Sequence, residues 1–328
     1  MKILFIPRIQ PKCKDKDIHL YKTLLTGFKK HGDELIYCDI VNLQRPSNQP
    51  KRGWRKKILG HVLSIYKNID LLIGPAIHKK IIKPWREDLR DAWLKTNLNY
   101  INVELGYLGN RRKNPSIGYN GINGEAIFLN SNSPGDRWDK FKKNITDDYR
   151  IYNRLLPEIN KPYHLGSDEV KLPPWRNTGD EVLIIQQIPT DCALISRQLP
   201  AINMDDWTLK QKQKYEKMGH KVRIRPTTNP GRSLEQDFIH AKLVVTCSSN
   251  CGVLSVLAGI PTIAEYPISM VYNLCKKNKT PDREQWLKNL LYCQWHLEEI
   301  ENGDMWDHLK TPDLSNILSE SQINEYRL

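Results

Sequence analysis

Residues 243–267, LVVTCSSNCGVLSVLAGIPTIAEYP, constrain the fold of this chain more than any other stretch. An apolar strand leads directly into Ser248–Asn250, and a short apolar helix is predicted over 253–258. The turn Gly259–Pro261 then returns the chain to a second apolar strand, predicted over 260–264. Strand, helix and strand in this order predict parallel neighbours in a sheet with helices on both faces.

The same alternation extends along the whole chain, and 328 residues are enough for two domains of this kind. Prolines and glycines between 161 and 180 indicate a linker. We therefore predict an α/β protein with two Rossmann-like, doubly wound domains, residues 1–165 and 181–328, joined by a linker over 166–180. Further strands are predicted over 3–6, 34–40, 70–73, 100–105, 181–186 and 221–225. A loop-rich stretch with little secondary structure is predicted over 106–136. The predicted helices include 21–31, 206–218, 233–239 and a long C-terminal helix over 283–301.

Several classes of protein are disfavoured by composition. The chain has no apolar run of about 18 residues, so we expect no membrane-spanning helix. Its N-terminus lacks the pattern of a signal peptide, which predicts a cytoplasmic protein. The seven cysteines are odd in number and irregularly spaced, which argues against a disulfide framework. Cys247 and Cys251 have no further ligands at zinc-site spacing, so no metal site is predicted.

Charge is distributed unevenly. The net charge is +13, and residues 1–170 hold 31 basic and 18 acidic side chains, whereas 171–328 hold 19 of each. The entire surplus therefore lies in the first half, which suggests that this half contacts a polyanion. The alternative is a lysine-rich surface with no such partner.

Residues 248–250 are the predicted anion site. The unpaired N–H groups at the start of a helix, together with two hydroxyls, form a cradle for a phosphate. Gly252 is expected to allow a phosphate to approach closely. The alternative is simple helix capping, for which Ser and Asn are common residues.

This unit, with segments around it, resembles the donor-binding half of GT-B glycosyltransferases. Gln186-Gln187 and Pro189-Thr190-Asp191 follow the first strand of the second domain, as in related bacterial and phage enzymes. Arg223–Pro226 lies where capsule-type transferases have an RPHP-like motif, with Thr227 in place of the histidine. Residues 283–306, REQWLKNLLYCQWHLEEIENGDMW, are similar to a C-terminal signature of tailed-phage transferases that glycosylate hydroxymethylated pyrimidines in DNA.

The resemblance implies a GT-B fold with a cleft between the domains. It also implies a transferase that moves a glucose- or arabinose-type sugar from a UDP-sugar to hydroxymethylcytosine in phage DNA, in the cytoplasm of the host cell. No cofactor is required beyond the UDP-sugar co-substrate, and a monomer without membrane attachment is expected. The residues implied to bind the donor are Gln187, Thr190, Asp191, Arg225, Ser248, Ser249, Asn250, Gly252 and Glu265.

Two carboxylates are candidates for the catalytic base. Glu104 ends the predicted fourth strand, and inverting transfer needs a group that takes the acceptor hydroxyl's proton. Asp136 is the second choice. The alternative role for Glu104 is an ion pair with Arg111 or Arg112.

Tryptophans alternate with basic residues in the first half, a combination that suits DNA because Lys and Arg neutralise phosphates and tryptophan stacks on an extruded base. Two other functions remain open: transfer to a cell-surface glycan or small molecule, and nucleotide or nucleic-acid binding without catalysis. A Rossmann oxidoreductase is disfavoured because no GxGxxG follows the first strand. The candidate DNA-binding residues are Trp54, Arg55, Lys56, Lys57, Trp85, Arg111 and Arg112.

Overall fold

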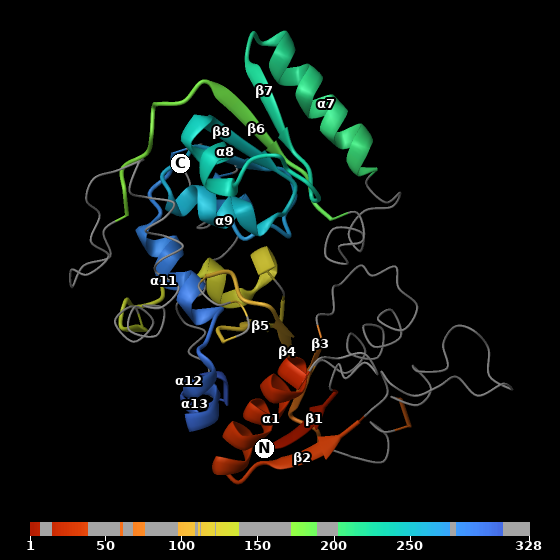
Figure 1. The fold of residues 1–328 in the computed structure, drawn as a ribbon. Coiled ribbons are helices and arrows are strands. Elements are labelled where there is room, and N and C mark those ends of the chain that lie inside the picture. The colour runs from red at the N-terminus through yellow and green to blue at the C-terminus, as the bar shows by residue number, and fades with distance from the viewer. Residues whose placement is uncertain are drawn as a thin grey trace, which may run out of the picture. The chain divides into compact units, whose positions relative to one another are not determined.

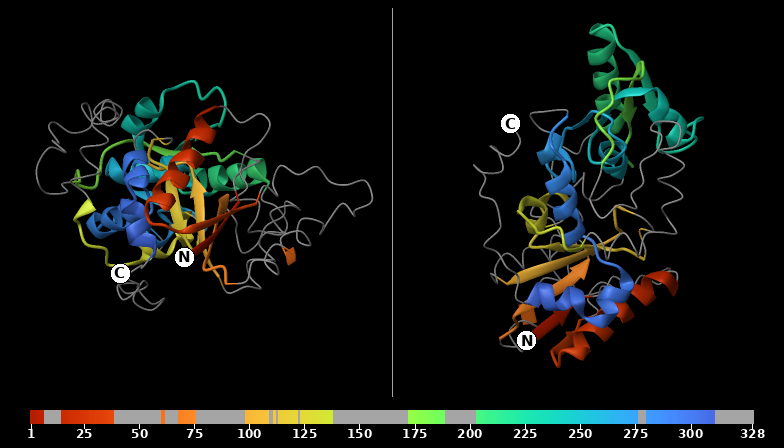
Figure 2. Two further views of the ribbon diagram at one scale, coloured as in Figure 1. Left: turned by 90° about the horizontal axis from the view of Figure 1, so that it is seen from below. Right: turned by 90° about the vertical axis from the view of Figure 1, so that its left-hand side faces the viewer.

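The computed structural model divides the chain into two compact units, which are described separately (Figures 1 and 2). Unit 1 comprises Met1–Ile122, Ala126–Phe128 and Cys293–Asn316, and unit 2 comprises Asn123–Glu125, Leu129–Tyr292 and Ile317–Leu328. The structure describes residues 1–6, 15–38, 60–61, 68–75, 98–108, 111, 113–121, 123–137, 172–188, 203–275 and 280–310.

Unit 1 is built on a five-stranded sheet of order β2-β1-β3-β4-β5. The first four strands pair in parallel, and β5 is antiparallel to β4. The centres of β1 and β3 are fully buried, as their apolar sequences KILF and LLIGP predict for strands covered on both faces. The strands are β1 (Lys2–Phe5), β2 (Glu34–Tyr37), β3 (Leu71–Pro75), β4 (Asn99–Glu104) and β5 (Ser116–Tyr119).

Helix α1 (Asp15–Lys30) packs against two short helices from the end of the chain, α12 (Leu297–Asn302) and α13 (Asp304–Lys310). Gly27 lets α1 approach closely, because a Cβ there would overlap the carbonyl oxygen of Ile300. The rings of Phe28 and Trp306 meet edge to face at 4.8 Å. Trp306 Nε1 also donates to Asp33 Oδ2 at 2.5 Å, and hydrogen bonds and the Lys310 charge lower the pKa of the Asp33 carboxyl although burial opposes this.

The single long C-terminal helix predicted over 283–301 is wrong. The structure has α11 (Glu284–Tyr292), then an extended segment, then α12 with His296 as its N-cap. Gln294 bridges to Ser116 of β5, and Trp295 N donates to Pro115 O at 3.1 Å. The helical periodicity continues across this segment, but the pairing with unit 1's edge strand determines its conformation.

Unit 2 contains a four-stranded, fully parallel sheet of order β7-β6-β8-β9. Helix α7 (Met204–Lys217) packs on one face with the core around Val182 and Ile184. Helices α8 (Leu234–His240) and α9 (Asn250–Leu257) pack on the other face, around Leu183 and Ile185. The strands are β6 (Glu181–Ile185), β7 (Lys221–Arg225), β8 (Ala241–Thr246) and β9 (Thr262–Ala264), with α10 (Tyr272–Cys275) after them.

The predicted strand–helix–strand unit over 243–264 is confirmed. Gly259 ends the turn after α9 with φ +72°, and its amide hydrogen-bonds to Val256 O. A Cβ at Gly259 would also overlap Pro174 O, so glycine is required there for two reasons.

Two 3₁₀ turns, Asn123–Glu125 and Ile127–Asn130, and the segment to 137 follow β5. Within unit 2, the buried Asn289 of α11 holds part of this segment: its Nδ2 donates to Leu129 O at 3.1 Å and Ser131 O at 2.6 Å. Its Oδ1 accepts from Ser133 N at 3.1 Å. The predicted loop over 106–136 therefore contains β5 and these turns.

The units differ from the predicted boundaries of 1–165 and 181–328. Residues 123–125 and 129–137 belong to unit 2, and 293–310 belong to unit 1. Close packing of α12 and α13 on α1 accounts for the second difference. Among the described helices, none is both long and apolar enough to cross a membrane.

Candidate functional site

The carboxyl edge of the unit 2 sheet has the topology of a ligand site. Strand β7 lies on one side of β6 and β8 lies on the other, so the strand order reverses between β6 and β8. Ligands of open α/β sheets bind outside the carboxyl ends of the strands at such a switch point. In unit 2 this position is formed by Gln186-Gln187 after β6 and by Cys247–Ser249 after β8.

The turn from β8 into α9 brings two serines to this edge. Ser249 is the N-cap of α9: its Oγ accepts from Cys251 N at 3.3 Å, and its own N donates to Thr246 Oγ1 at 3.1 Å. Its role in the structure is therefore the capping one. Ser248 differs, because its Oγ is buried and has no hydrogen-bond partner in the described part of the chain. A buried hydroxyl without a partner is unfavourable unless a ligand or water supplies one.

Gly252 has a packing role in the structure, besides the expected one at the phosphate. A Cβ at Gly252 would lie 3.1 Å from Thr246 Cγ2 and 3.3 Å from Val271 Cγ2. Glycine at this position therefore allows α9 to pack closely on β8, because a Cβ would point at side-chain atoms of the protein. Its amide donates to Ser249 O at 2.9 Å. Asn250 is the first residue of α9.

Glu265 follows β9 at the same edge and is held by α7. Its Oε2 accepts from Trp207 Nε1 at 2.8 Å, and its Oε1 accepts from Gln211 Nε2 at 2.8 Å. The carboxylate is thus fixed in orientation, and each oxygen retains capacity for a further hydrogen bond.

The groups around Glu265 are kept protonated. Burial raises the pKa of the Cys247 thiol well above its usual range, and the nearby carboxylate of Glu265 adds to the effect. Burial, with the charges of Cys247 and Glu265, raises the pKa of Tyr266 to about 12. A thiol held in this state is a poor metal ligand. Within the described ranges, no group of His, Cys, Asp or Glu is arranged to hold a metal ion.

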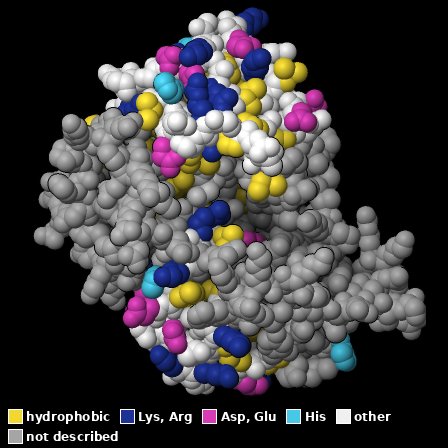
Figure 3. Space-filling model, in the orientation of Figure 1, with side chains coloured by type: hydrophobic (Ala, Val, Ile, Leu, Met, Phe, Trp, Pro, Cys, Tyr) yellow, Lys and Arg dark blue, Asp and Glu magenta, His cyan; other side chains and the backbone are white. Residues whose placement is uncertain are grey.

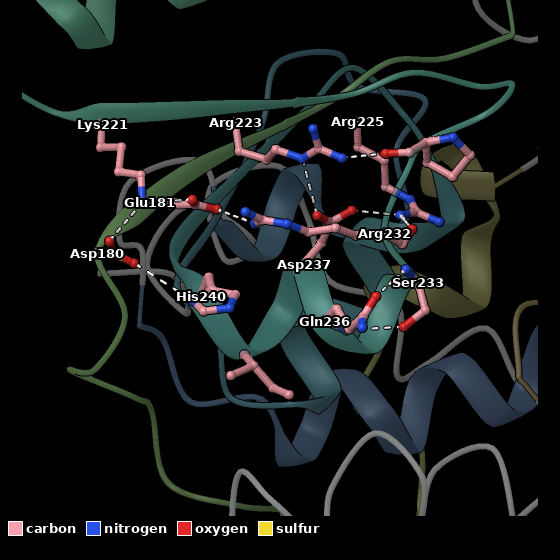
Figure 4. A network of polar contacts seen from close by, with 12 residues as sticks. Asp180, Glu181, Lys221, Arg223, Arg225, Arg232, Ser233, Gln236, Asp237 and His240 are labelled. Carbon is pink, nitrogen blue, oxygen red and sulfur yellow. Dashed lines mark hydrogen bonds and ion pairs between the residues drawn. The ribbon is translucent and has the colours of Figure 1, made fainter.

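Arg225 ends β7 and belongs to a polar network on the α8 face of the sheet (Figure 4). Its Nη1 donates to Asp237 Oδ2 at 2.5 Å and to Arg232 O at 2.9 Å. Arg223 Nε donates to the other oxygen, Asp237 Oδ1, at 3.2 Å. The Asp237 side chain has no solvent-exposed surface.

The network continues to the amino end of the sheet, where Glu181 pairs with Arg232 at 2.9 Å and Lys221 at 3.0 Å. Burial opposes ionisation of Glu181, but hydrogen bonds from Lys221 and Arg232 lower the pKa of its carboxyl below the usual value. Figure 3 shows Lys and Arg side chains gathered beside acidic ones on this unit.

In unit 1, Glu104 is the last residue of β4 and pairs with Ser116 across the antiparallel β4–β5 ladder. The turn after it is fixed by the buried Gln294, whose Oε1 accepts from Tyr107 N at 2.7 Å and Leu108 N at 3.0 Å. Arg111, one expected partner of Glu104, donates from Nε to Gly106 O at 2.6 Å. The predicted position of Glu104 at the end of the fourth strand is confirmed.

The second candidate base, Asp136, lies in unit 2 and is exposed. Its Oδ1 accepts a hydrogen bond of 2.5 Å from the hydroxyl of Tyr292. Burial and this carboxylate both raise the pKa of Tyr292, so the hydroxyl keeps its proton and remains a donor. This hydrogen bond joins Asp136 to Tyr292, the last residue of α11.

Several predicted site residues lie outside the described part of the chain. They are Thr190 and Asp191 of the donor set, and Trp54, Arg55, Lys56, Lys57, Trp85 and Arg112 of the DNA set. Gln187 is described, and it lies buried just beyond β6.

The sequence interpretation missed Asp237, Trp207, Gln211 and Gln294. A signal for the first was present: Arg223 and Arg225 alternate on β7, so both point to one face and need a buried counter-ion there. The other three contact residues far away in the sequence, so their partners follow only from the tertiary structure.

No protein-family model matches the chain, and no curated protein matches it. Among solved structures, it is similar to KpsC of Thermosulfurimonas dismutans, a beta Kdo 2,7 transferase, with a TM-score of 0.49 and 11% identity over 94% of this chain and 99% of that one. It is also similar to an extracellular ligand-binding receptor from Verminephrobacter eiseniae, with a TM-score of 0.31 and 10% identity over 97% and 88%.

A periplasmic sugar-binding protein from Pseudomonas fluorescens has a TM-score of 0.25 and 13% identity over 78% of this chain and 63% of that one. Similarity at this level identifies neither a substrate nor a reaction. The function is therefore argued from the chain's own residues.

Proposed function

We propose that the protein is a glycosyltransferase that binds the diphosphate of a nucleotide-sugar at the carboxyl edge of unit 2. The observation that carries the proposal is the buried Ser248 Oγ, a hydroxyl without a hydrogen-bond partner among the described residues, at the switch point of a parallel sheet and beside the start of α9. A phosphate oxygen would accept from this hydroxyl and lie at the positive end of the helix.

The fixed carboxylate of Glu265 supports a nucleotide as the ligand. It lies at the end of β9, on the same edge, and accepts bonds that orient it without saturating it. Hydroxyl donors, which a sugar offers, are suitable partners for such a carboxylate. UDP is the proposed nucleotide, and no metal or other cofactor is proposed.

The proposed catalytic base is Glu104. It would take the proton of the acceptor hydroxyl as the acceptor oxygen attacks the anomeric carbon, while the bond from that carbon to the diphosphate breaks.

The proposed acceptor is hydroxymethylcytosine in DNA, and the support for it is the charge surplus of residues 1–170. A hydroxymethyl group lies in the major groove, and the nucleotide would flip out to reach the site. A cell-surface glycan or small molecule is the rival acceptor, and it requires no basic surface.

Donor binding is tested by calorimetry with UDP. Losing charge-assisted hydrogen bonds to a phosphate costs about 1.5–3 kcal/mol each, so Arg225→Ala should weaken binding by roughly tenfold or more. Lys221→Ala is the matched control, because it removes a cation from the amino end of the same strand. Equal affinity of the Arg225→Ala variant and the wild type would remove Arg225 from the site.

The reaction and the acceptor are tested together. Hydroxymethylcytosine DNA is incubated with the protein and a panel of nucleotide-sugars, and the nucleosides are analysed by mass spectrometry. Binding to duplex DNA is measured from about 50 to 200 mM salt, where each neutralised phosphate should contribute a log–log slope near −0.9. A protein that hydrolyses a sugar nucleotide but ignores DNA at low salt would exclude the DNA acceptor and leave the transferase proposal in place.

A further inference from the structure

Arg225 lies on the same face and edge of the unit 2 sheet as the start of α9. It pairs in register with Ile185, which packs in the core beneath α8 and α9. Two strand spacings, about 10 Å, separate β7 from β8. An extended arginine side chain and a diphosphate group can bridge that distance together.

The guanidinium of Arg225 is only partly used by the protein. Both N–H groups of Nη1 are engaged, one by Asp237 and one by Arg232 O. Neither Nε nor Nη2 has a hydrogen-bond partner among the described residues, and 16% of the side chain is exposed. Arg225 is therefore fixed at one nitrogen and has donors left at the other two.

We propose that Asp237 is a positioning residue for the donor diphosphate, since it holds Arg225 with Nε and Nη2 available at the carboxyl edge. This inference rests on the proposed donor site of unit 2. Asp237 itself is completely buried and does not contact the ligand; it acts through Arg225. Arg223 completes its coordination from the other side, so both carboxylate oxygens are occupied.

Charge and positioning predict opposite signs for a change at Asp237. Buried Asp237 carries one negative charge, and the partly buried Arg223 and Arg225 carry two positive charges. Neutralising the acid makes the site more positive, which by charge alone would tighten the binding of an anion. If Asp237 instead positions Arg225, the loss of its second oxygen releases the guanidinium and weakens binding.

The test is a double-mutant cycle with calorimetric titration of UDP into the full chain. Asp237→Asn should weaken UDP affinity by about five- to tenfold, and it should add nothing when Arg225→Ala is already present. Glu181→Gln is the matched control: its carboxyl is also buried and ion-paired but lies at the amino end of the sheet. It should change the affinity by less than about twofold.

The outcomes are distinct. Unchanged or tighter UDP binding by Asp237→Asn would overturn the positioning role, and so would an equal loss of affinity in Glu181→Gln. In either case the proposed donor site stands if Arg225→Ala still weakens UDP binding. A wild type that does not bind UDP would overturn the donor proposal and this inference with it.

A second variant covers the case in which Asp237→Asn fails to fold. Arg225→Lys keeps a positive charge beside Asp237, so the buried acid stays paired and the fold is retained. Its single ammonium cannot bind Asp237 and also present the two nitrogens that the guanidinium presents. UDP affinity as low as that of Arg225→Ala supports the proposal, and wild-type affinity contradicts it.

Discussion

The two sheets of this protein share the order of four parallel strands, and among the strands that the structure describes only the sheet of unit 1 has a fifth. They also differ in the side chains at their carboxyl edges. In unit 1, β2-β1-β3-β4 is extended by the antiparallel β5, whereas β7-β6-β8-β9 of unit 2 is parallel throughout. Unit 1 has a carboxylate, Glu104, at its edge, followed by a turn fixed by Gln294. Unit 2 has the buried hydroxyl of Ser248, which has no hydrogen-bond partner in the part of the chain that the structure describes.

The comparison shows that the shared topology determines where a site can form, while the side chains after each strand determine its chemistry. Unit 1 offers a proton acceptor, and unit 2 offers donors to an anion. The division of roles in the proposed transferase follows from this difference.

The largest expected effect concerns the two carboxylates. Glu104→Gln should lower turnover by about 10²–10⁴-fold, because general-base catalysis contributes about that much. UDP affinity should stay unchanged, since the substitution lies in unit 1. Asp136→Asn is the comparison variant and should keep most of the turnover, because Tyr292 already binds that carboxylate. The reverse ranking in a transfer assay would make Asp136 the base.

The second prediction compares one buried amide in each unit. Gln294→Ala and Asn289→Ala each leave buried backbone groups without partners, which should lower the free energy of unfolding by about 3 kcal/mol or more. Urea unfolding measures both. Only Gln294→Ala should also reduce turnover, since it releases the turn after Glu104. Lys210 is exposed, so Lys210→Ala is the control. A loss of stability as large in that variant would show that the loss does not come from buried backbone groups left without partners.

The third prediction separates two glycines on helices. Gly27→Ala should destabilise the protein by about 1–3 kcal/mol, because the new methyl group meets the backbone of Ile300. Gly252→Ala should have a smaller effect, since its neighbours are methyl groups of Thr246 and Val271. It should also bind UDP normally; a strong loss of affinity would support the phosphate-contact role for Gly252.

The smallest effect is a pH dependence. The folded-state pKa of Glu181 is lowered, so its ion pairs stabilise the protein above the unfolded-state pKa, about 4.3. That contribution is lost as the pH falls from there through the folded-state pKa. Glu181→Gln should therefore remove part of the acid sensitivity and leave the pH dependence near neutrality unchanged. An acid unfolding curve identical in shape to that of the wild type would show that these ion pairs contribute little.

Local patterns in the sequence predicted the elements but not their partners. The apolar strands of both sheets and the turn at Gly259 were predictable, because burial on two faces and a positive φ leave clear signatures. The extended segment at Gln294 was not, because its conformation is determined by pairing with β5. Ser248 and Glu265 follow strands that the sequence predicted, but the bonds from Trp207 and Gln211 to Glu265 depend on how α7 packs.

Hydrogen–deuterium exchange with and without UDP tests the donor site most directly. We expect protection by UDP at 186–187, 225–226 and 246–253, which form the carboxyl edge of the unit 2 sheet. Residues 180–182 and 221–222, at the amino edge of the same sheet, should exchange at unchanged rates. Protection confined to the amino edge or to unit 1, or no protection at saturating UDP, would contradict the placement of the donor at this edge.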